Sequence, residues 1–305
     1  MDVRIKQTAV CFMLGGAVLH AIVMAQSPRF DVSKAEELME LTGSSGEIQD
    51  LVFSPDGKSL AIAAGDPVGR IWNLEQGRLG VQLKGHEKTI KGMAYSPDGK
   101  SVLTIGDDYF LKIWDSSGKQ TSSFNLKCNS STGDVLWTKD NRALVACKTL
   151  RYVNLKTGAF TGEFKDIFAY RMAMPTDQSS VAVSVGDKDF ALLDTKTLER
   201  YRVLKGHESQ GFFISYSADG KLIATGASDR TARVWNASTG KTLQVLRHDL
   251  SINDVALSPN GKILATACDD DTVKLWDTAS GEQLRTLEHK EDVLQLAWSK
   301  DGQRL

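Results

Sequence analysis

A short turn sequence returns along this chain at a nearly constant interval, and it limits the possible folds more than any other feature. Ser-Pro-Asp-Gly-Lys occupies residues 54–58 and again residues 96–100. Related turns are centred on Asp140, Asp177, Asp219, Asn260 and Asp301. Counted from Asp56, the intervals between central residues are 42, 42, 37, 42, 41 and 41. A fixed period of this size indicates a repeat protein, in which each copy supplies one supersecondary unit.

The residues of the turn predict the secondary structure of each repeat unit. Proline presets the backbone at the second turn position, and glycine accepts the left-handed conformation that closes a short hairpin. Apolar runs flank the turn on both sides, as at residues 50–53 and 59–62. Short apolar runs on either side of a tight turn are typical of paired strands. The sequence therefore predicts an all-β fold built from repeated hairpins.

A second marker ends a later strand in most copies. Four copies carry Trp followed by Asn or Asp, at Trp72, Trp114, Trp235 and Trp276. The third and fourth copies keep the frame but place Val153 and Leu193 there. With both markers present, the region from about residue 37 to residue 305 resembles the WD-repeat (Trp-Asp repeat) family. That resemblance implies a β-propeller of four-stranded antiparallel blades, one blade for each repeat.

The number of blades follows from counting repeats. Six copies are complete, and His289 with the turn at Asp301 begins a seventh. The Trp position of that seventh copy would fall at 317, beyond the last residue. We therefore expect a seven-bladed propeller at 37–305 that is C-terminally incomplete, with a truncated last blade. Residues 37–42 resemble an outer strand and are expected to close the ring, since closure removes exposed sheet edges. A six-bladed ring with a loose tail is the alternative.

The WD-repeat resemblance also implies a structural role for most of the histidines. Blades of this family typically contain His, Ser or Thr, Asp and Trp hydrogen-bonded in series. The matching sets here are His86, Thr104, Asp108 and Trp114; His207, Thr225, Asp229 and Trp235; and His248, Thr266, Asp270 and Trp276. Such a tetrad satisfies a buried imidazole and a buried indole N–H, which are costly to leave unpaired.

This assignment argues against catalysis. Every histidine beyond residue 25 lies at a tetrad position, and the chain contains no Gly-rich nucleotide motif, P-loop, nucleophile elbow or Cys-x-x-Cys pair. The aspartates at 107–108 and 269–271 fit tight turns better than a calcium site. We therefore predict that the chain is not an enzyme, with no catalytic residue, no cofactor-binding residue and no metal ligand.

The third blade lacks the tetrad residues and carries two cysteines instead. Counting from its turn places Cys128 at the histidine position, and counting from Val153 places Cys147 at the aspartate position. Since the tetrad His and Asp touch, a Cys128–Cys147 disulfide is one prediction for an exported protein. Two unpaired, partly buried thiols are the alternative. Blade three is also three residues shorter here, which leaves the register of Cys147 open. Cys268 is expected to be a core residue.

The N-terminus has the pattern of a secretory signal peptide. Arg4 and Lys6 precede an apolar run from residue 9 to 23, and Val23 and Ala25 are the small residues of a cleavage site. We predict a signal peptide at 1–25 cut after Ala25, a linker at 26–36, and a secreted or periplasmic protein of bacterial type. No stable membrane span is expected after cleavage, since the apolar run is short for one. An uncleaved anchor is the alternative.

Charge bears on the partners. The chain has 37 basic and 38 acidic residues, without the basic stripe that phosphate contacts need, so no nucleic acid partner is expected. Propellers of this family bind partners on the face that bears the loops between blades. Candidate residues on that rim are Lys91, Asp107, Tyr109, Phe212, Ser228, Arg230 and Leu294. Phe212 and Leu294 are apolar and would be contact anchors unless they pack between blades.

These observations favour a non-catalytic exported scaffold that mediates protein–protein interaction. The main rival is a propeller enzyme or small-ligand binder that uses the central channel, which would need ionisable residues converging from several first strands. Those strands read as apolar at residues 93–95 and 255–257, which favours the scaffold. A third possibility is one module of a longer protein whose activity lies in a missing C-terminal part.

Overall fold

The structure is a computed structural model of the 305-residue chain. It describes residues 11–14, 18–21, 32, 41–42, 46–128, 133–147, 149–164, 167, 169 and 171–305. Among these residues there are strands and turns but no α-helix. No helix of the described residues is long and apolar enough to cross a membrane.

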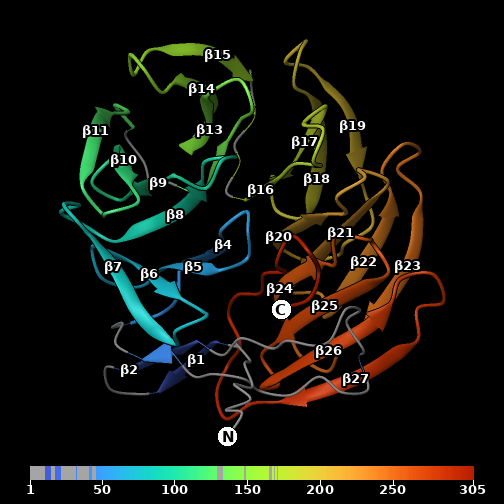
Figure 1. Ribbon diagram of the computed structural model, residues 1–305. Helices are drawn as coiled ribbons and strands as arrows, with labels where there is room; N and C mark the ends of the chain where they lie inside the picture. Colours follow the sequence, from blue (N-terminus) through green and yellow to red (C-terminus); the bar gives the residue numbers. More distant parts are fainter. Residues whose placement is uncertain are drawn as a thin grey trace, which may run out of the picture.

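Six four-stranded antiparallel sheets stand side by side around a centre, as the blades of a propeller (Figure 1). Within each blade the strands follow chain order from the inner edge to the outer edge. Blades one to three are β4 (Asp50–Phe53), β5 (Ser59–Ala63), β6 (Val68–Asn73), β7 (Arg78–Lys84); β8 (Ile90–Tyr95), β9 (Ser101–Gly106), β10 (Phe110–Asp115), β11 (Gln120–Asn125); and β12 (Val135–Trp137), β13 (Arg142–Cys147), β14 (Thr149–Asn154), β15 (Phe160–Phe164). Blades four to six are β16 (Met172–Ala173), β17 (Ser180–Val185), β18 (Asp189–Asp194), β19 (Arg200–Leu204); β20 (Gly211–Tyr216), β21 (Leu222–Ala227), β22 (Thr231–Asn236), β23 (Thr242–Arg247); and β24 (Ile252–Leu257), β25 (Ile263–Cys268), β26 (Thr272–Asp277), β27 (Gln283–Glu288).

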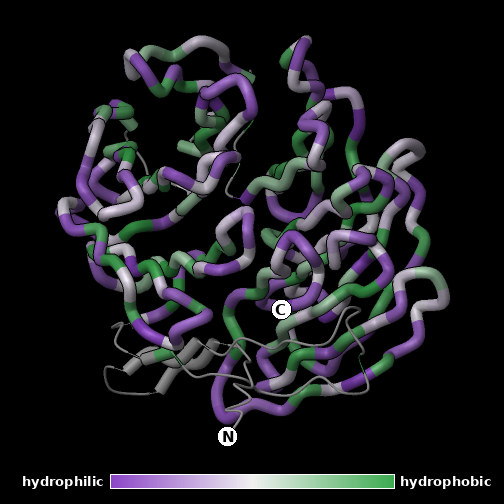
Figure 2. Tube along the Cα trace, in the orientation of Figure 1, coloured by the Kyte–Doolittle hydropathy of each residue, from purple (hydrophilic) through white to green (hydrophobic). Residues whose placement is uncertain are grey.

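Burial explains why the second strands of the blades are rich in apolar and small residues. Both faces of β5, β9 and β25 are covered by neighbouring blades, whereas outer strands such as β23 alternate exposed and buried residues. Hydrophobic clusters accordingly lie between successive blades rather than in one central core. Figure 2 shows hydrophobic and hydrophilic stretches alternating along the trace of the blades. The all-β, four-stranded antiparallel architecture expected from the repeats is confirmed.

The prediction of seven blades is wrong, because the structure has six. Residues 289–305 form no strand, and only Arg304 makes an isolated bridge. They are not the loose tail of the alternative either. The N–H of Leu296 donates to Asp254 at 2.7 Å, and Arg304 donates to the carbonyl of Gly57 in blade one. Val293 and Leu305 are buried in the cluster shared by blades six and one. This segment therefore occupies the place where an inner strand of a further blade would lie.

The expected closing strand also pairs differently. Of residues 37–42 the structure describes Leu41–Thr42 (β3), which pairs with β2 (Val18–Ala21), and β2 pairs with β1 (Cys11–Leu14). Residues 289–305 form no strand to which residues 37–42 could add an outer strand. Leu41 instead packs in the cluster between blades one and six. Figure 1 shows this small sheet between those two blades. Most of the predicted signal peptide and linker lies outside the described residues, so that prediction stands untested.

Candidate functional site

The chain direction in each blade gives the propeller two different end faces. One, the hairpin face, carries the turns between the first and second strands, including the Ser-Pro-Asp-Gly turns. The other, the linker face, carries the turns between second and third strands together with the links between blades. Backbone hydrogen bonds tie these two parts of the linker face together, as from Asp107 to Thr89 and from Ser228 to Gln210. The tetrads lie beneath the linker face, and the predicted rim residues lie on it.

In blade two the predicted tetrad forms a continuous chain of hydrogen bonds. Nδ1 of His86 lies 2.9 Å from Asp108, and Nε2 of His86 lies 2.7 Å from Oγ1 of Thr104. Nε1 of Trp114 donates to the same Thr104 oxygen at 2.8 Å. His207, Thr225, Asp229 and Trp235 repeat this arrangement in blade five with distances of 2.8–2.9 Å. These side chains connect the link before a blade to its second and third strands.

Blade six departs from this pattern, which corrects the expectation for one of the three sets. Trp276 donates to Thr266 at 2.9 Å and Thr266 lies 3.1 Å from Nε2 of His248. The bond from His248 to Asp270 is missing. Asp270 accepts from Thr272, as Asp229 does from Thr231, and at 2.9 Å from Nζ of Lys274 in place of the histidine. Nδ1 of His248 is buried without a hydrogen-bond partner.

Protonation follows from these environments. Burial lowers the pKa of His86 and of His207 despite their aspartate partners, so both rings are neutral at pH 7. The pKa of His248 falls to about 4, because of burial first and the nearby Lys274 charge second. Burial would raise the pKa of Asp229, but hydrogen bonds from Thr231 and the Glu208 N–H hold it below its ordinary range. The carboxylates of intact tetrads are therefore charged acceptors for neutral imidazoles.

Cys128 and Cys147 form a disulfide with a Cα–Cα distance of 6.0 Å. The register that suggested the pair is nonetheless wrong for one partner. Cys147 is the last residue of β13 and pairs with Thr149, so it matches Cys268 at the end of β25 rather than a tetrad aspartate. Because β14 begins at Thr149, two residues after Cys147, this blade has no equivalent of a tetrad aspartate. The bond thus joins the link after β11 to the second strand of blade three, as a tetrad does elsewhere.

Polar side chains of the innermost strands converge on the central channel, which overturns the expectation that these strands are apolar. Asp50 in blade one accepts the backbone N–H of Met93 in blade two at 2.7 Å. Asp134 in blade three accepts that of Met172 in blade four at 3.0 Å. Asp254 in blade six does the same for Leu296 in the C-terminal segment. Each carboxylate therefore fastens one inner strand to the next.

One arginine faces these three carboxylates. Arg171, in the link before β16, donates across the channel to the carbonyl of Gln49 at 3.0 Å. Burial raises the pKa of Asp50 and of Asp254 to about 7, and the charge of Arg171 opposes that rise at all three aspartates. The four side chains line a cavity of about 480 Å³ that extends to turns of the hairpin face at Thr176, Ala218 and Pro259.

Alignment of the repeats on their turns would have identified these channel residues. Asp50, Asp134, Arg171 and Asp254 each lie six residues before the central turn residue of their copy. The apolar runs at 93–95 and 255–257 begin one residue after this position, so they do not include the inward-facing residue of each strand.

The predicted rim residues are distributed around the linker face. Lys91 donates to Gln49 at 2.8 Å and lies 3.6 Å from Asp107. Tyr109 and Arg230 occupy the tips of equivalent turns in blades two and five with φ near +65° (66° and 63°), and Arg230 and Ser228 are exposed. Phe212 and Leu294, expected as apolar anchors, are partly buried. The structure does not gather the seven residues into one patch.

Comparison with known proteins agrees with this architecture. The family model described as "WD domain, G-beta repeat" matches residues 35–73, 77–115, 198–236 and 240–277, just over half of the chain. The chain therefore belongs to the WD-repeat family. The unmatched stretch between 115 and 198 contains blades three and four, which lack the Trp and His markers.

Relatives match over different lengths. Protein tipD of Dictyostelium discoideum is 26% identical over 229 residues, which is 71% of this chain and 37% of that protein. F-box-like/WD repeat-containing proteins TBL1Y of Homo sapiens and TBL1X of Mus musculus are each 44% identical over 50 residues, 15% of this chain and 10% of those proteins. The chain thus spans a little over a third of tipD and a tenth of the other two.

Proposed function

We propose that this chain is a non-catalytic, exported scaffold that binds a protein partner through its linker face. The observation that carries the proposal is that the polar side chains suited to chemistry already hold the fold together. Two histidines and their aspartates are used in tetrads, and three channel carboxylates accept backbone N–H groups. A rigid disc with exposed turns, whose tetrad and channel carboxylates are engaged in holding the fold, suits recognition. WD-repeat propellers commonly mediate protein–protein interaction, which supports the same reading.

Export is the second part of this proposal. It rests on the basic start, the apolar run from residue 9 to 23 and the small residues before Gln26. N-terminal sequencing of the protein recovered outside the cytosol should give a chain that begins at Gln26. Recovery of the protein with Met1 in the cytosolic fraction would contradict export.

Partner binding is tested with two matched surface variants. Tyr109→Ala combined with Arg230→Glu alters the linker face, and Lys58→Ala combined with Lys221→Ala alters exposed residues near the hairpin face. Cross-linking mass spectrometry of the exported protein identifies the partner and the lysines that it approaches. We expect the linker-face variant to weaken its binding at least tenfold, measured as Kd, and the other variant to leave Kd unchanged. Cross-links confined to the hairpin face would refute the proposal.

The channel supports a second candidate function, a site for a small cationic ligand. Three carboxylates outnumber the two cations, Arg171 and Lys300, around a cavity of about 480 Å³. Isothermal titration with small diamines and basic amino acids tests it against an Asp134→Asn variant. Heat of binding that disappears in the variant favours the ligand site, and its absence in both proteins favours the scaffold alone. A role as one module of a longer protein is compatible with either.

A further inference from the structure

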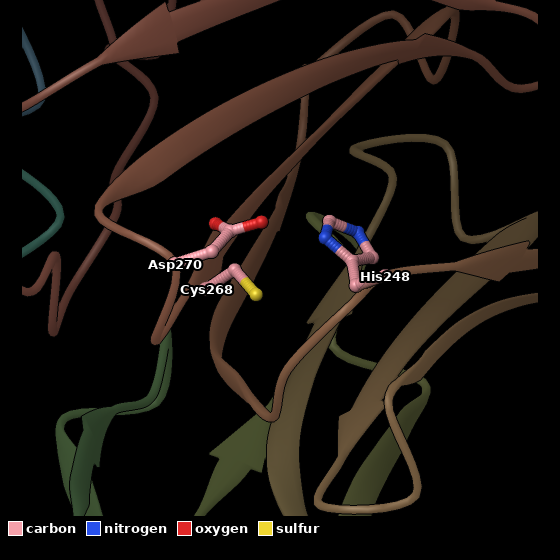
Figure 3. A group of neighbouring side chains, drawn as sticks. All are labelled: His248, Cys268 and Asp270. Atoms are coloured by element: carbon pink, nitrogen blue, oxygen red, sulfur yellow. The ribbon is translucent and has the colours of Figure 1, made fainter.

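Blade six contains a buried imidazole nitrogen that points at two further metal-ligating groups. A ring nitrogen of His248, Sγ of Cys268 and a carboxylate oxygen of Asp270 all lie within 4.8 Å of one another (Figure 3). His248 is 8% exposed and Cys268 is fully buried. Among the hydrogen bonds of the described residues, Nδ1 has no partner. A buried nitrogen left unpaired costs about 1–3 kcal/mol, so this arrangement needs a compensating ligand.

The comparison with blades two and five explains the arrangement. Gly106 and Ala227 occupy the position of Cys268 in those blades, each at the end of the second strand. A Cβ atom on Gly106 would lie 2.8 Å from Nδ1 of His86 and 3.0 Å from Asp108. Side chains at this position therefore project at the pair formed by the tetrad His and Asp. The thiol of Cys268 accordingly lies where the other blades make their His–Asp hydrogen bond.

We propose that His248, Cys268 and Asp270 form a binding site for a divalent transition-metal ion of the Zn²⁺ or Co²⁺ type. Imidazole nitrogen, thiolate and carboxylate are the three kinds of ligand that zinc takes from proteins, and a water molecule completes a tetrahedral site. A thiolate and a carboxylate balance the charge of a divalent ion, so the bound group is neutral and compatible with burial. Neither the WD-repeat assignment nor the scaffold proposal includes such a site.

The hydrogen bonds behind the histidine fit a metal ligand. Oγ1 of Thr266 accepts from Trp276 and lies 3.3 Å from the carbonyl of Lys274. When the Thr266 hydroxyl donates to that carbonyl, Nε2 of His248 donates to Thr266 and Nδ1 presents its lone pair to Cys268. A metal-bound histidine commonly donates its other ring N–H in this way, which fixes the tautomer.

The charged groups around the site determine how binding depends on pH. Lys274 bonds to Asp270, and the charges of Asp249 and Asp270 also act on His248. The thiolate is the form of cysteine that binds a metal ion, so metal binding releases the Cys268 thiol proton. Affinity should rise about tenfold for each pH unit between 6 and 8, because one proton leaves for each ion bound.

The test uses Co²⁺ as a spectroscopic probe on the full chain in a Cys11→Ser background. Under non-reducing conditions the Cys128–Cys147 disulfide leaves Cys268 as the one thiol. We expect one equivalent of Co²⁺ to produce a thiolate-to-metal absorption band that Zn²⁺ removes and that strengthens with pH. Cys268→Ala should abolish the band while keeping the fold, because alanine is the residue of blade five at this position. Circular dichroism checks the fold.

A matched pair of histidine variants separates a metal ligand from a structural histidine. His248→Gln should lower Co²⁺ affinity at least a hundredfold, whereas His207→Gln disturbs the equivalent tetrad of blade five and should leave the affinity unchanged. Absence of the band in folded wild-type protein at pH 8 would overturn the site. A band that persists in Cys268→Ala, or equal losses in both histidine variants, would show adventitious binding only and would overturn it too.

Discussion

Single side chains in this propeller act as junctions between strands. Asp229 accepts from the backbone N–H of Glu208 at 2.9 Å, from the N–H and hydroxyl of Thr231, and lies 2.9 Å from His207. Asp270 has the same place in the blade-six sequence and likewise accepts from the hydroxyl two residues later, on Thr272, but its other partner is Lys274 and not the histidine. Identical residue types at identical spacing thus form different networks, because the neighbouring Cys268 is larger than Ala227.

This difference predicts unequal effects of the same substitution. Asp229→Ala should lower the free energy of unfolding by about 3 kcal/mol, because His207 and two backbone N–H groups lose the carboxylate that accepts their hydrogen bonds. Asp270→Ala should cost less, about 1 kcal/mol in metal-free protein, since among the described residues neither His248 nor a backbone N–H donates to Asp270. Urea unfolding followed by tryptophan fluorescence measures both. Equal losses would contradict the assignment of the broken tetrad to blade six.

At the scale of the strand and blade, different side-chain interactions hold equivalent parts of the blades together. Each blade must attach its preceding link to its second strand. Blades two and five use a tetrad, and blade three uses the disulfide between Cys128 and Cys147. In blade one Asp66, at the tetrad aspartate position, bonds to Arg70 of β6 at 2.6–2.8 Å, a contact that joins the second and third strands and not the preceding link. The blade geometry is kept although the connecting chemistry changes.

The disulfide should make stability sensitive to reductant. It closes a loop with a sequence separation of 19 residues, for which the restriction of the unfolded chain is worth about 3 kcal/mol. We expect dithiothreitol to lower the free energy of unfolding by about that amount. A Cys128→Ala, Cys147→Ala variant should match reduced wild type and show no further response to dithiothreitol. An unchanged wild-type urea midpoint under full reduction would contradict this role.

The ring as a whole depends on contacts that no single blade contains. Carboxylates at Asp50, Asp134 and Asp254 fasten successive inner strands, and Arg171 reaches from blade four to the backbone of blade one. The C-terminal segment and Leu41 of β3 pack in the cluster between blades one and six. Closure of this ring is therefore partly electrostatic and partly apolar.

Loss of the channel arginine should destabilise the ring in a pH-dependent manner. Asp50 and Asp254 have folded-state pKa values raised to about 7 by burial. A raised carboxyl pKa gives stability that is complete below the unfolded value near 4 and is lost as pH rises through 7. Arg171→Met removes the cation that offsets this loss. The free energy of unfolding of this variant should lie about 3 kcal/mol below that of wild type at pH 8, and less than about 1 kcal/mol below it at pH 4.5.

Urea unfolding at both pH values measures this dependence. The exposed Arg230→Met substitution is the control and should show no pH-dependent deficit. A deficit for Arg171→Met that is as large at pH 4.5 as at pH 8 would exclude the electrostatic role of the channel cluster.

The sequence by itself determined the fold class, because a turn that recurs every 37–42 residues and a strand that ends in Trp-Asp specify local hairpins without reference to distant contacts. It also identified His86, His207 and their aspartates as partners, since their spacing repeats with the blades. The blade count, the channel cluster and the broken tetrad needed tertiary structure. Whether residues 293–305 pair or merely pack depends on what fills the gap between blades one and six. Likewise, the environment of His248 depends on a thiol brought beside it by packing, which spacing along the chain does not reveal.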